Sequence, residues 1–241
     1  MHKVYEFETL DSTNTYLKEN WDKLQDEDVV TALHQTSGRG RLGRTWNDSS
    51  SSLLFSLLLK DSLDPEKIGL IPLLTGVSVL LAFQDHGIPA KIKWPNDVLV
   101  HDRKACGILV EAVTEEKVKA VVDGVGINLN NSSFDPSIKD KAISLSQVLG
   151  KPLGRKEMLA SFLLHFDSLY QDFQKGNNSF LPILKENSYL DGKEATLDYY
   201  GENKHVRVLS VLDDGRLLVD DSGKKLALSA GEVSLHSVYT E

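Results

Sequence analysis

The chain has 241 residues, of which 41% are hydrophobic and 26% charged, which are ordinary values for a globular protein. Its formal net charge of -8 argues against a general nucleic-acid binder, since such proteins are usually basic. The single cysteine, Cys106, excludes an internal disulfide and fits a reducing cytosol, so we expect a cytoplasmic protein.

We expect neither a signal peptide nor a membrane span. The N-terminus lacks the apolar core that a signal peptide needs. The apolar runs Leu53–Leu59 and Leu70–Phe83 are too short, or too interrupted by polar residues, to cross a bilayer. The length suits one large domain, or a medium domain followed by a small one.

The N-terminal third predicts three strands and one short helix. Val4–Phe7 is typical of a first strand, and Asp11, Ser12 or Thr13 can cap a helix that follows. Val29–Leu33 and Leu53–Leu59 predict buried strands on either side of a long polar loop. A long polar loop between buried strands is usually functional.

That loop, Gln35–Trp46, combines glycine with arginine. Gly38, Gly40 and Gly43 allow close approach of the backbone to a ligand, and Arg39, Arg41 and Arg44 supply planar forks of donors for carboxylate or phosphate. We favour an anionic small molecule as the ligand. A basic mobile surface loop and a nucleic-acid contact are the alternatives.

A helix from about Glu66 to Asp85, ended by Gly87, is predicted to belong to the core. In Lys91–Val100, Pro95 interrupts any strand ladder, and Asn96 and Asp97 favour a turn, so a hairpin is expected here. Trp94, just before this turn, could equally be an ordinary aromatic residue of the core.

Two further strands carry unusual residues. Lys104 stands at the entry of an otherwise apolar strand, and Gly107 inside that strand indicates either close approach of a ligand or a bend. Gly124 and Gly126, two apart in the next strand, leave a groove for a flat ligand or for a closely packed helix. Asn128 ends that strand.

The remainder of the chain is helical and then β-rich. The chain turns helical from Ser144, with helices predicted over Arg155–Gln174 and Phe180–Asn187. We therefore divide the chain into residues 1–188 and a small β domain, 189–241. Its predicted strands are Ala195–Tyr199, Val206–Leu212, Leu217–Val219, Leu226–Leu228 and Glu232–Val238.

Taken together, these motifs resemble those of the biotin protein ligases over the whole chain. The matching residues are Asp11–Asn14, Gln35, Gly38–Arg44, Trp46, Lys93–Asp97, Arg103–Lys104, Gly107–Glu111, Gly124–Asn128 and, near the C-terminus, Gly231–Leu235. The resemblance implies an α+β fold, with a mixed β-sheet and flanking helices as in class II aminoacyl-tRNA synthetases. It also implies a small C-terminal SH3-like β-barrel.

The resemblance further implies ATP-dependent activation of biotin to biotinyl-5′-AMP, then transfer of biotin to a lysine of a carrier domain. It assigns catalysis to Lys104 and Arg41. The implied biotin contacts are Ser12, Thr13, Gln35, Gly38, Arg39, Arg41, Lys104, Gly107, Gly124 and Gly126. The implied ATP contacts are Arg39, Arg41, Arg44, Trp46, Lys104 and Asn128, with Trp46 and Asn128 at the adenine and triphosphate end. Mg²⁺ is the expected cofactor, with Asp97 a candidate ligand.

By the same resemblance, the partners are biotin carrier domains of acetyl-CoA or pyruvate carboxylase, and a homodimer is compatible with it. The first family motif begins at residue 11, so we expect no helix-turn-helix domain and no DNA binding.

We expect the segment from Thr36 to Ser51 to order over its ligands as a lid. Ala105–Cys106 departs from the family pattern, and we interpret Cys106 as a core residue. A lipoate ligase or octanoyltransferase is the nearest alternative, and a nucleic-acid-binding protein is another.

Overall fold

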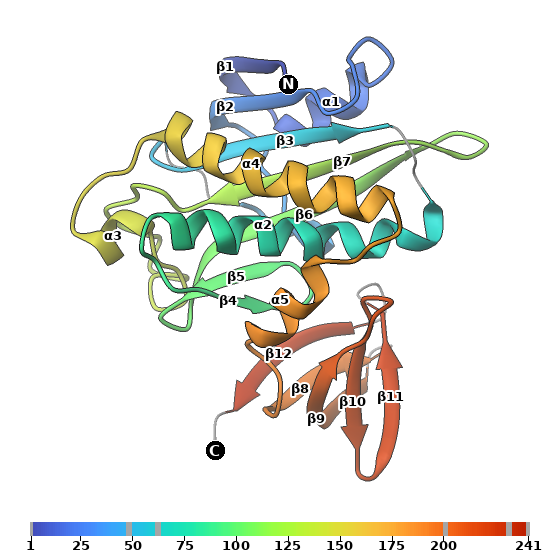
Figure 1. The fold of residues 1–241 in the computed structure, drawn as a ribbon. Coiled ribbons are helices and arrows are strands. Elements are labelled where there is room, and N and C mark those ends of the chain that lie inside the picture. The colour runs from blue at the N-terminus through green and yellow to red at the C-terminus, as the bar shows by residue number, and fades with distance from the viewer. Residues whose placement is uncertain (1, 47–49, 61–63, 200–201, 230–232, 240–241) are drawn as a thin grey trace.

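The computed structural model describes residues 2–46, 50–60, 64–199, 202–229 and 233–239. Gly231 and Glu232 of the C-terminal motif, and residues 47–49 of the proposed lid, lie outside these ranges. The chain forms a seven-stranded sheet with flanking helices, followed by a five-stranded sheet (Figure 1). The expected α+β architecture with a second, small β unit is confirmed.

The large sheet has the strand order β1-β2-β3-β7-β6-β5-β4. The β1–β2 pair is parallel and the other pairs are antiparallel, so the sheet is mixed as predicted. Its strands are β1 Val4–Leu10, β2 Val29–Gln35, β3 Leu53–Leu59, β4 Lys91–Lys93, β5 Asp97–Val100, β6 Arg103–Thr114 and β7 Val118–Ile127. The helices are α1 Thr13–Asn20, α2 Ile71–Asp85, α3 Leu145–Leu149, α4 Arg155–Gln174 and α5 Phe180–Glu186.

Every residue of β3 is buried, because helices or loops cover both faces of the sheet. Side chains alternate between the faces along a strand. Phe55 and its odd-numbered neighbours enter the main core beneath α2 and α4, which run side by side across one face (Figure 1). Leu58 instead packs with Leu17 of α1 and Val122 of β7 on the opposite face. The functional residues lie on this α1 face.

The helix predicted from Glu66 to Asp85 is wrong in its first turns. Residues Pro65–Leu70 form a 3₁₀-helix, and α2 begins at Ile71. Pro72 explains the change, since proline lacks an N–H and its ring would clash with the carbonyl of residue 68. Pro72 is tolerated because it lies in the first turn of α2.

By length and composition, the stretch Pro65–Asp85 would suffice to cross a membrane, with 21 residues and a mean hydropathy of 1.7 in its most apolar 18-residue window. However, 67% of its most apolar window is buried inside the protein. This burial is typical of the core helix that the sequence predicts here.

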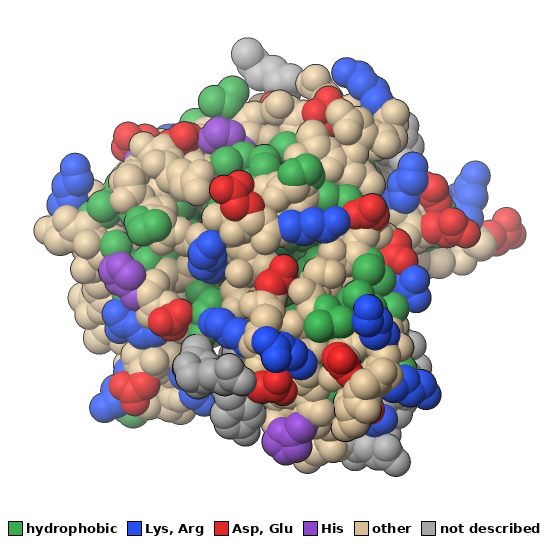
Figure 2. All heavy atoms as spheres, turned by 60° about the horizontal axis from the view of Figure 1, so that its bottom comes forward, with side chains coloured by type: hydrophobic (Ala, Val, Ile, Leu, Met, Phe, Trp, Pro, Cys, Tyr) green, Lys and Arg blue, Asp and Glu red, His purple; other side chains and the backbone are tan. Residues whose placement is uncertain are grey.

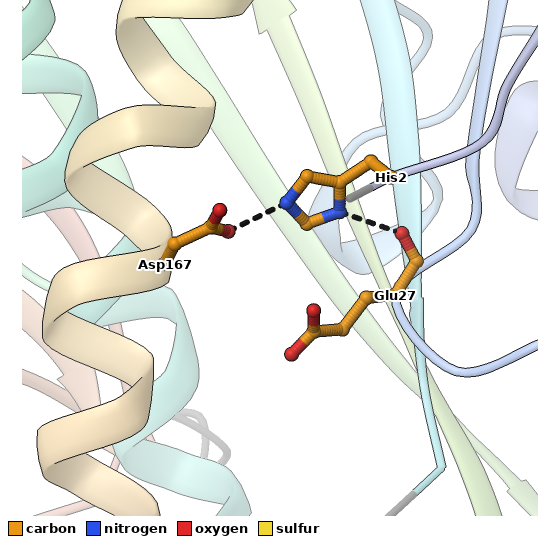
Figure 3. Close-up of side chains that lie close together, drawn as sticks. All are labelled: His2, Glu27 and Asp167. Carbon is orange, nitrogen blue, oxygen red and sulfur yellow. Dashed lines mark hydrogen bonds and ion pairs between the residues drawn. The ribbon is translucent and has the colours of Figure 1, made fainter.

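His2 fastens the start of the chain to α4. Its Nε2 lies 2.5 Å from Asp167 Oδ1, and its Nδ1 lies 2.8 Å from the carbonyl oxygen of Glu27 (Figure 3). Both ring nitrogens thus lie within hydrogen-bond distance of an oxygen from another part of the chain. This contact joins edge strand β1 and the entry to β2 to the helical layer.

The C-terminal sheet has the order β11-β10-β9-β8-β12 and is antiparallel throughout. Its strands are β8 Glu194–Tyr199, β9 Glu202–Val211, β10 Leu217–Asp221, β11 Lys224–Leu228 and β12 Val233–Tyr239. The predicted hairpin turns are present, with Gly215 at φ +84° and Gly223 at φ +92°. Only glycine adopts such angles at little cost. The division of the chain at residue 188 stays a prediction.

Candidate functional site

A cavity of about 220 Å³ opens on the α1 face of the large sheet. It is bounded by the N-terminus of α1, the loop 35–46, the turn between β4 and β5, the first half of β6 and the C-terminal end of β7. The predicted site residues that line it are Ser12, Thr13, Gln35, Arg39, Arg41, Arg44, Trp46, Asp97, Lys104, Gly107, Gly124 and Gly126. Gly38 and Asn128 do not line it.

Glycines make the floor of the cavity flat. Gly126 of β7 pairs with Gly107 of β6 on one side and with Leu54 of β3 on the other. A Cβ atom on Gly126 would lie 2.7 Å from Trp46 Cζ2, and one on Gly107 would lie 2.8 Å from Trp46 Cζ3. Trp46 therefore lies directly on Gly107 and Gly126, which the resemblance assigns to biotin, and its place at the adenine end stays a prediction.

Gly124 has a different neighbour, Asn14 of α1, which also lines the cavity and was not among the predicted site residues. A Cβ atom on Gly124 would lie 2.1 Å from Asn14 Oδ1, so only glycine leaves room for this amide. Asn14 Oδ1 accepts a hydrogen bond from Ser56 Oγ at 2.6 Å, and Asn14 Nδ2 donates to Glu111 Oε2 at 2.8 Å. The position of Asn14 in the first motif was the available signal.

One end of the cavity is polar but carries no charge. Ser12 is the N-cap of α1, although its side chain makes no capping hydrogen bond. The N–H and Oγ1 of Thr13 donate to Gln35 Oε1 at 2.7 and 3.0 Å. Ser56 Oγ, which carries a single proton, also lies 2.7 Å from Thr13 Oγ1. These fixed hydroxyl and amide groups can hydrogen-bond a neutral polar ligand group.

A β-bulge places Lys104 in the cavity. In β6, Cys106 pairs with Val98 but Lys104 pairs with Leu99, so Ala105 is an extra residue. In a regular strand, Lys104 and Gly107 would face opposite sides of the sheet, because they are three residues apart. The bulge turns Lys104 to the same face, where its Nζ lies 2.6 Å from Asp97 Oδ1 and 5.5 Å from the centre of the Trp46 ring.

Asn128 holds the main chain of Lys104 from behind. Asn128 is 6% exposed, and its Nδ2 donates to the Lys104 carbonyl at 3.1 Å. The Lys104 N–H also donates to the Lys141 carbonyl at 2.7 Å. The predicted contact between Asn128 and ATP therefore finds no support in this geometry, in which Asn128 supports a cavity residue and does not line the cavity.

Cations surround the other end of the cavity. Arg39, Arg41, Arg44, Lys93 and Lys104 line it, and Asp97 is the only carboxylate residue among its described lining residues. Burial lowers the pKa of Arg41, and the charge of Arg44 lowers it further. Burial is also the main cause that lowers the pKa of Lys93, with Lys104 adding to the effect. A bound anion would offset both effects, because a nearby opposite charge favours the charged forms of Arg41 and Lys93.

Lys93 lines the cavity and belongs to a family motif, but it was not among the predicted site residues. The same is true of Asn96, three residues later. Asn96 Oδ1 accepts from Arg41 Nη1 at 3.3 Å, and Asn96 Nδ2 donates to the Ile108 carbonyl at 2.7 Å. The turn before β5 therefore ties the arginine loop to β6.

Gly38 shapes the loop from outside the cavity. Its carbonyl accepts the Trp46 N–H at 3.0 Å, and a Cβ atom on it would lie 3.1 Å from Gln35 Nε2. Arg39 and Thr45 form an isolated antiparallel bridge, so the loop folds back on itself.

Cys106 is fully buried, and burial raises the pKa of its thiol. Its interpretation as a core residue is confirmed.

The basic residues do not extend into a broad basic surface on the face shown in Figure 2. There, blue basic and red acidic side chains are interspersed. A continuous basic stripe or patch is typical of nucleic-acid-binding proteins, and this face shows none.

The chain is similar to known protein ligases in sequence and in structure. Residues 6–128, just over half of the chain, match the biotin/lipoate A/B protein ligase family. The chain is 36% identical over 202 residues to the bifunctional ligase/repressor BirA of Bacillus subtilis, covering 81% of this chain and 59% of that protein. It is 29% identical to the biotin–[acetyl-CoA-carboxylase] ligase of Mycobacterium tuberculosis, covering 85% and 77%.

Among solved structures, the chain resembles the biotin protein ligase from Aquifex aeolicus in complex with biotin and ATP. The TM-score is 0.87 at 29% identity, covering 97% of this chain and 98% of that one. The segment 6–128 that matches the family contains the arginine loop 35–46, the Trp94–Asp97 turn, and the strands β6 and β7 with their glycines. On this match, the chain belongs to the biotin/lipoate A/B protein ligase family.

Proposed function

We propose that this protein is a biotin protein ligase, which activates biotin with ATP and transfers it to a lysine of a carrier domain. The observation that carries the proposal is one cavity with a neutral polar end, a flat glycine floor and a cationic end at Lys104. A slim ligand with an amide-like head and a carboxylate tail fits that sequence of surfaces. The likeness to a ligase structure with biotin and ATP supports the same assignment.

In the first step, a carboxylate oxygen of biotin attacks the α-phosphorus of ATP. A new P–O bond forms, the bond to the bridging oxygen breaks, and pyrophosphate leaves. Two anions must approach each other, so fixed cations near both lower the barrier. Lys104 fits this role because the bulge at Ala105 holds its ammonium group beside the glycine floor. Arg39, Arg41 and Arg44 are placed to hold the phosphates and the carboxylate.

In the second step, the uncharged ε-amine of a carrier lysine attacks the acyl carbon of biotinyl-5′-AMP. The C–N bond forms, the bond to the phosphate oxygen breaks, AMP leaves, and the amine loses its proton. We propose a biotin carrier domain of acetyl-CoA or pyruvate carboxylase as the partner. The name of the mycobacterial relative supports the acetyl-CoA carboxylase.

Mg²⁺ fits this cavity with Asp97 as its protein ligand. Mg²⁺ in phosphate sites is commonly held by one or two carboxylates together with the substrate phosphates. Asp97 supplies one carboxylate beside the basic wall, although its Oδ1 is also engaged by Lys104. When bound, the ion neutralises charge on the triphosphate.

We infer that the loop 36–51 closes as a lid over the acyl-adenylate, which hydrolyses if water reaches it. Contact of Trp46 with the glycine floor supports this role, since the same indole can lie over a ligand on that floor. We also propose a cytoplasmic enzyme that binds neither DNA nor membranes. A homodimer is compatible with the fold.

Biotin-dependent exchange of pyrophosphate into ATP tests the adenylation step directly. We expect exchange with biotin and none without it. Label transfer to a purified carrier domain, with lipoate in place of biotin as the matched control, tests the second step. Exchange and transfer with lipoate but not with biotin would replace the proposal with a lipoate ligase.

A further inference from the structure

The C-terminal sheet contacts the cavity through Trp94. This residue is 3% exposed, and it lines the cavity just before Asn96 and Asp97. Its indole Nε1 donates a hydrogen bond to the Gly215 carbonyl at 2.9 Å. Gly215 lies in the turn 212–216 between β9 and β10, so a buried side chain joins the two sheets.

The turn 212–216 is fitted closely against the start of α2. A Cβ atom on Gly215 would lie 2.8 Å from Leu70 Cδ2 and 3.2 Å from Leu73 Cδ1. Both leucines are buried, so neither side chain can swing into solvent to make room. The Gly215 carbonyl is therefore held at a fixed place relative to the large sheet.

Further hydrogen bonds and an ion pair hold the turn 212–216 in place. Arg216 Nε donates to Asp214 Oδ2 at 2.8 Å, and the Gly215 N–H donates to the Leu212 carbonyl at 2.9 Å. Lys185 of α5 forms an ion pair with Asp213 at 2.7 Å. A turn with this many contacts can act as a rigid support.

On the cavity side, the segment that follows Trp94 positions two cations. Asn96 accepts from Arg41, and Asp97 pairs with Lys104. The Ile108 N–H donates to the Asn96 carbonyl at 2.9 Å, which fixes the same segment to β6. A shift of Trp94 would therefore displace partners of both Arg41 and Lys104.

We propose that the turn 212–216 is a positioning element of the active site, which acts through Trp94 on Asn96 and Asp97. Gly215 itself does not line the cavity, and its carbonyl meets a cavity residue through the hydrogen bond from Trp94. The consequence for catalysis rests on the proposed adenylation reaction. The structural link does not, because it is a property of the protein without ligands.

Gly215→Ala and Gly223→Ala form a matched pair for the test. Both glycines lie in hairpins of the C-terminal sheet at strongly positive φ, so alanine strains both backbones. An added Cβ meets Leu70 only at position 215, and meets nothing within 4 Å at position 223. Any difference between the two variants therefore reports the contact of the turn with the large sheet.

Hydrogen exchange of the full-length protein without ligands provides the first measurement. We expect the Ile108 amide to exchange about fivefold to tenfold faster in Gly215→Ala than in wild type, the factor that corresponds to one lost hydrogen bond. We expect the Gly223→Ala protein to match wild type at this amide. Equal rates in all three proteins would overturn the proposal, whatever reaction the protein catalyses.

Kinetics of biotin-dependent ATP–pyrophosphate exchange provide the second measurement. We expect Gly215→Ala to lose about fivefold to tenfold in kcat/KM for ATP, while the Kd for biotin alone stays near the wild-type value. Trp94→Phe, which removes the indole donor, should cause a similar loss, and the double variant should lose little more. Additive losses, or equal losses in Gly215→Ala and Gly223→Ala, would overturn the positioning role. Absence of exchange in wild type would refute the proposed reaction, and the amide measurement would still decide the link.

Discussion

A buried carboxyl group on the helix side of β7 should make the stability of this protein depend on pH. Asp123 is 0% exposed. Thr75 Oγ1 donates to its Oδ2 at 2.6 Å, and its Oδ1 has no hydrogen-bond partner among the described residues. Burial raises the pKa of Asp123 to about 7. Asp123→Asn removes the ionisable group and keeps an oxygen that can accept from Thr75.

The direction follows from the two states of the chain. An unfolded aspartate has a pKa of about 3.9, whereas the folded one ionises near 7. The folded state is therefore not penalised below about pH 4, loses stability relative to the unfolded state as the pH rises to about 7, and is penalised fully above that. The penalty amounts to roughly 1.5 kcal/mol at pH 5 and roughly 4 kcal/mol at pH 8.5.

Urea unfolding of wild type and Asp123→Asn at pH 5 and pH 8.5 measures this difference. The asparagine brings its own cost, about 1 to 3 kcal/mol for an unpaired buried donor, but that cost does not change with pH. We therefore expect the free energy of unfolding of the variant, relative to wild type, to rise by roughly 2 to 3 kcal/mol between the two pH values. A relative stability that stays constant across this range would refute the buried, neutral carboxyl group.

Four further predictions concern the cavity and its loop. Lys104→Ala should abolish biotinyl-AMP formation while circular dichroism stays native, and near-normal ATP–pyrophosphate exchange would contradict its catalytic role. Gly126→Ala should displace Trp46 and weaken biotin binding at least about tenfold, because its Cβ would lie 2.7 Å from the indole; Gly69→Ala, where the Cβ meets nothing within 4 Å, is the control. Arg41→Ala should weaken both biotin and ATP in calorimetric titrations, and loss of only one ligand would show that this arginine does not contact both. Cleavage by a protease within 36–51 should slow when biotin and ATP are added, and unchanged cleavage would argue against a lid.

Several features of this protein were predictable from local sequence. The strands, α4 and the hairpin turns follow from hydrophobic period and turn residues, and the structure has them near the predicted bounds. The shared face of Gly124 and Gly126 follows from their spacing of two in one strand. The chemical types at the site were also predictable, because arginine and lysine in an acidic chain indicate an anionic ligand.

Other features depend on contacts between segments that are distant in the chain. Nothing in the local pattern shows that Ala105 is an extra residue, so the face that Lys104 occupies was decided by the pairing of β5 with β6. Likewise, Asn14 covers Gly124 only because α1 packs on β7. Asn128 turned out to support Lys104 from behind, because its amide reaches a main-chain carbonyl in the neighbouring strand.

The sequence by itself thus determined which groups the cavity contains, because residue type sets charge, hydrogen bonding and the room above a strand. Only the tertiary structure decided where those groups point and what holds them. A one-residue bulge reverses the face of a side chain, and the turn at Gly215 supports Trp94 from a different sheet. Both effects come from backbone pairing and packing over long sequence separations, for which a single sequence carries no local signal.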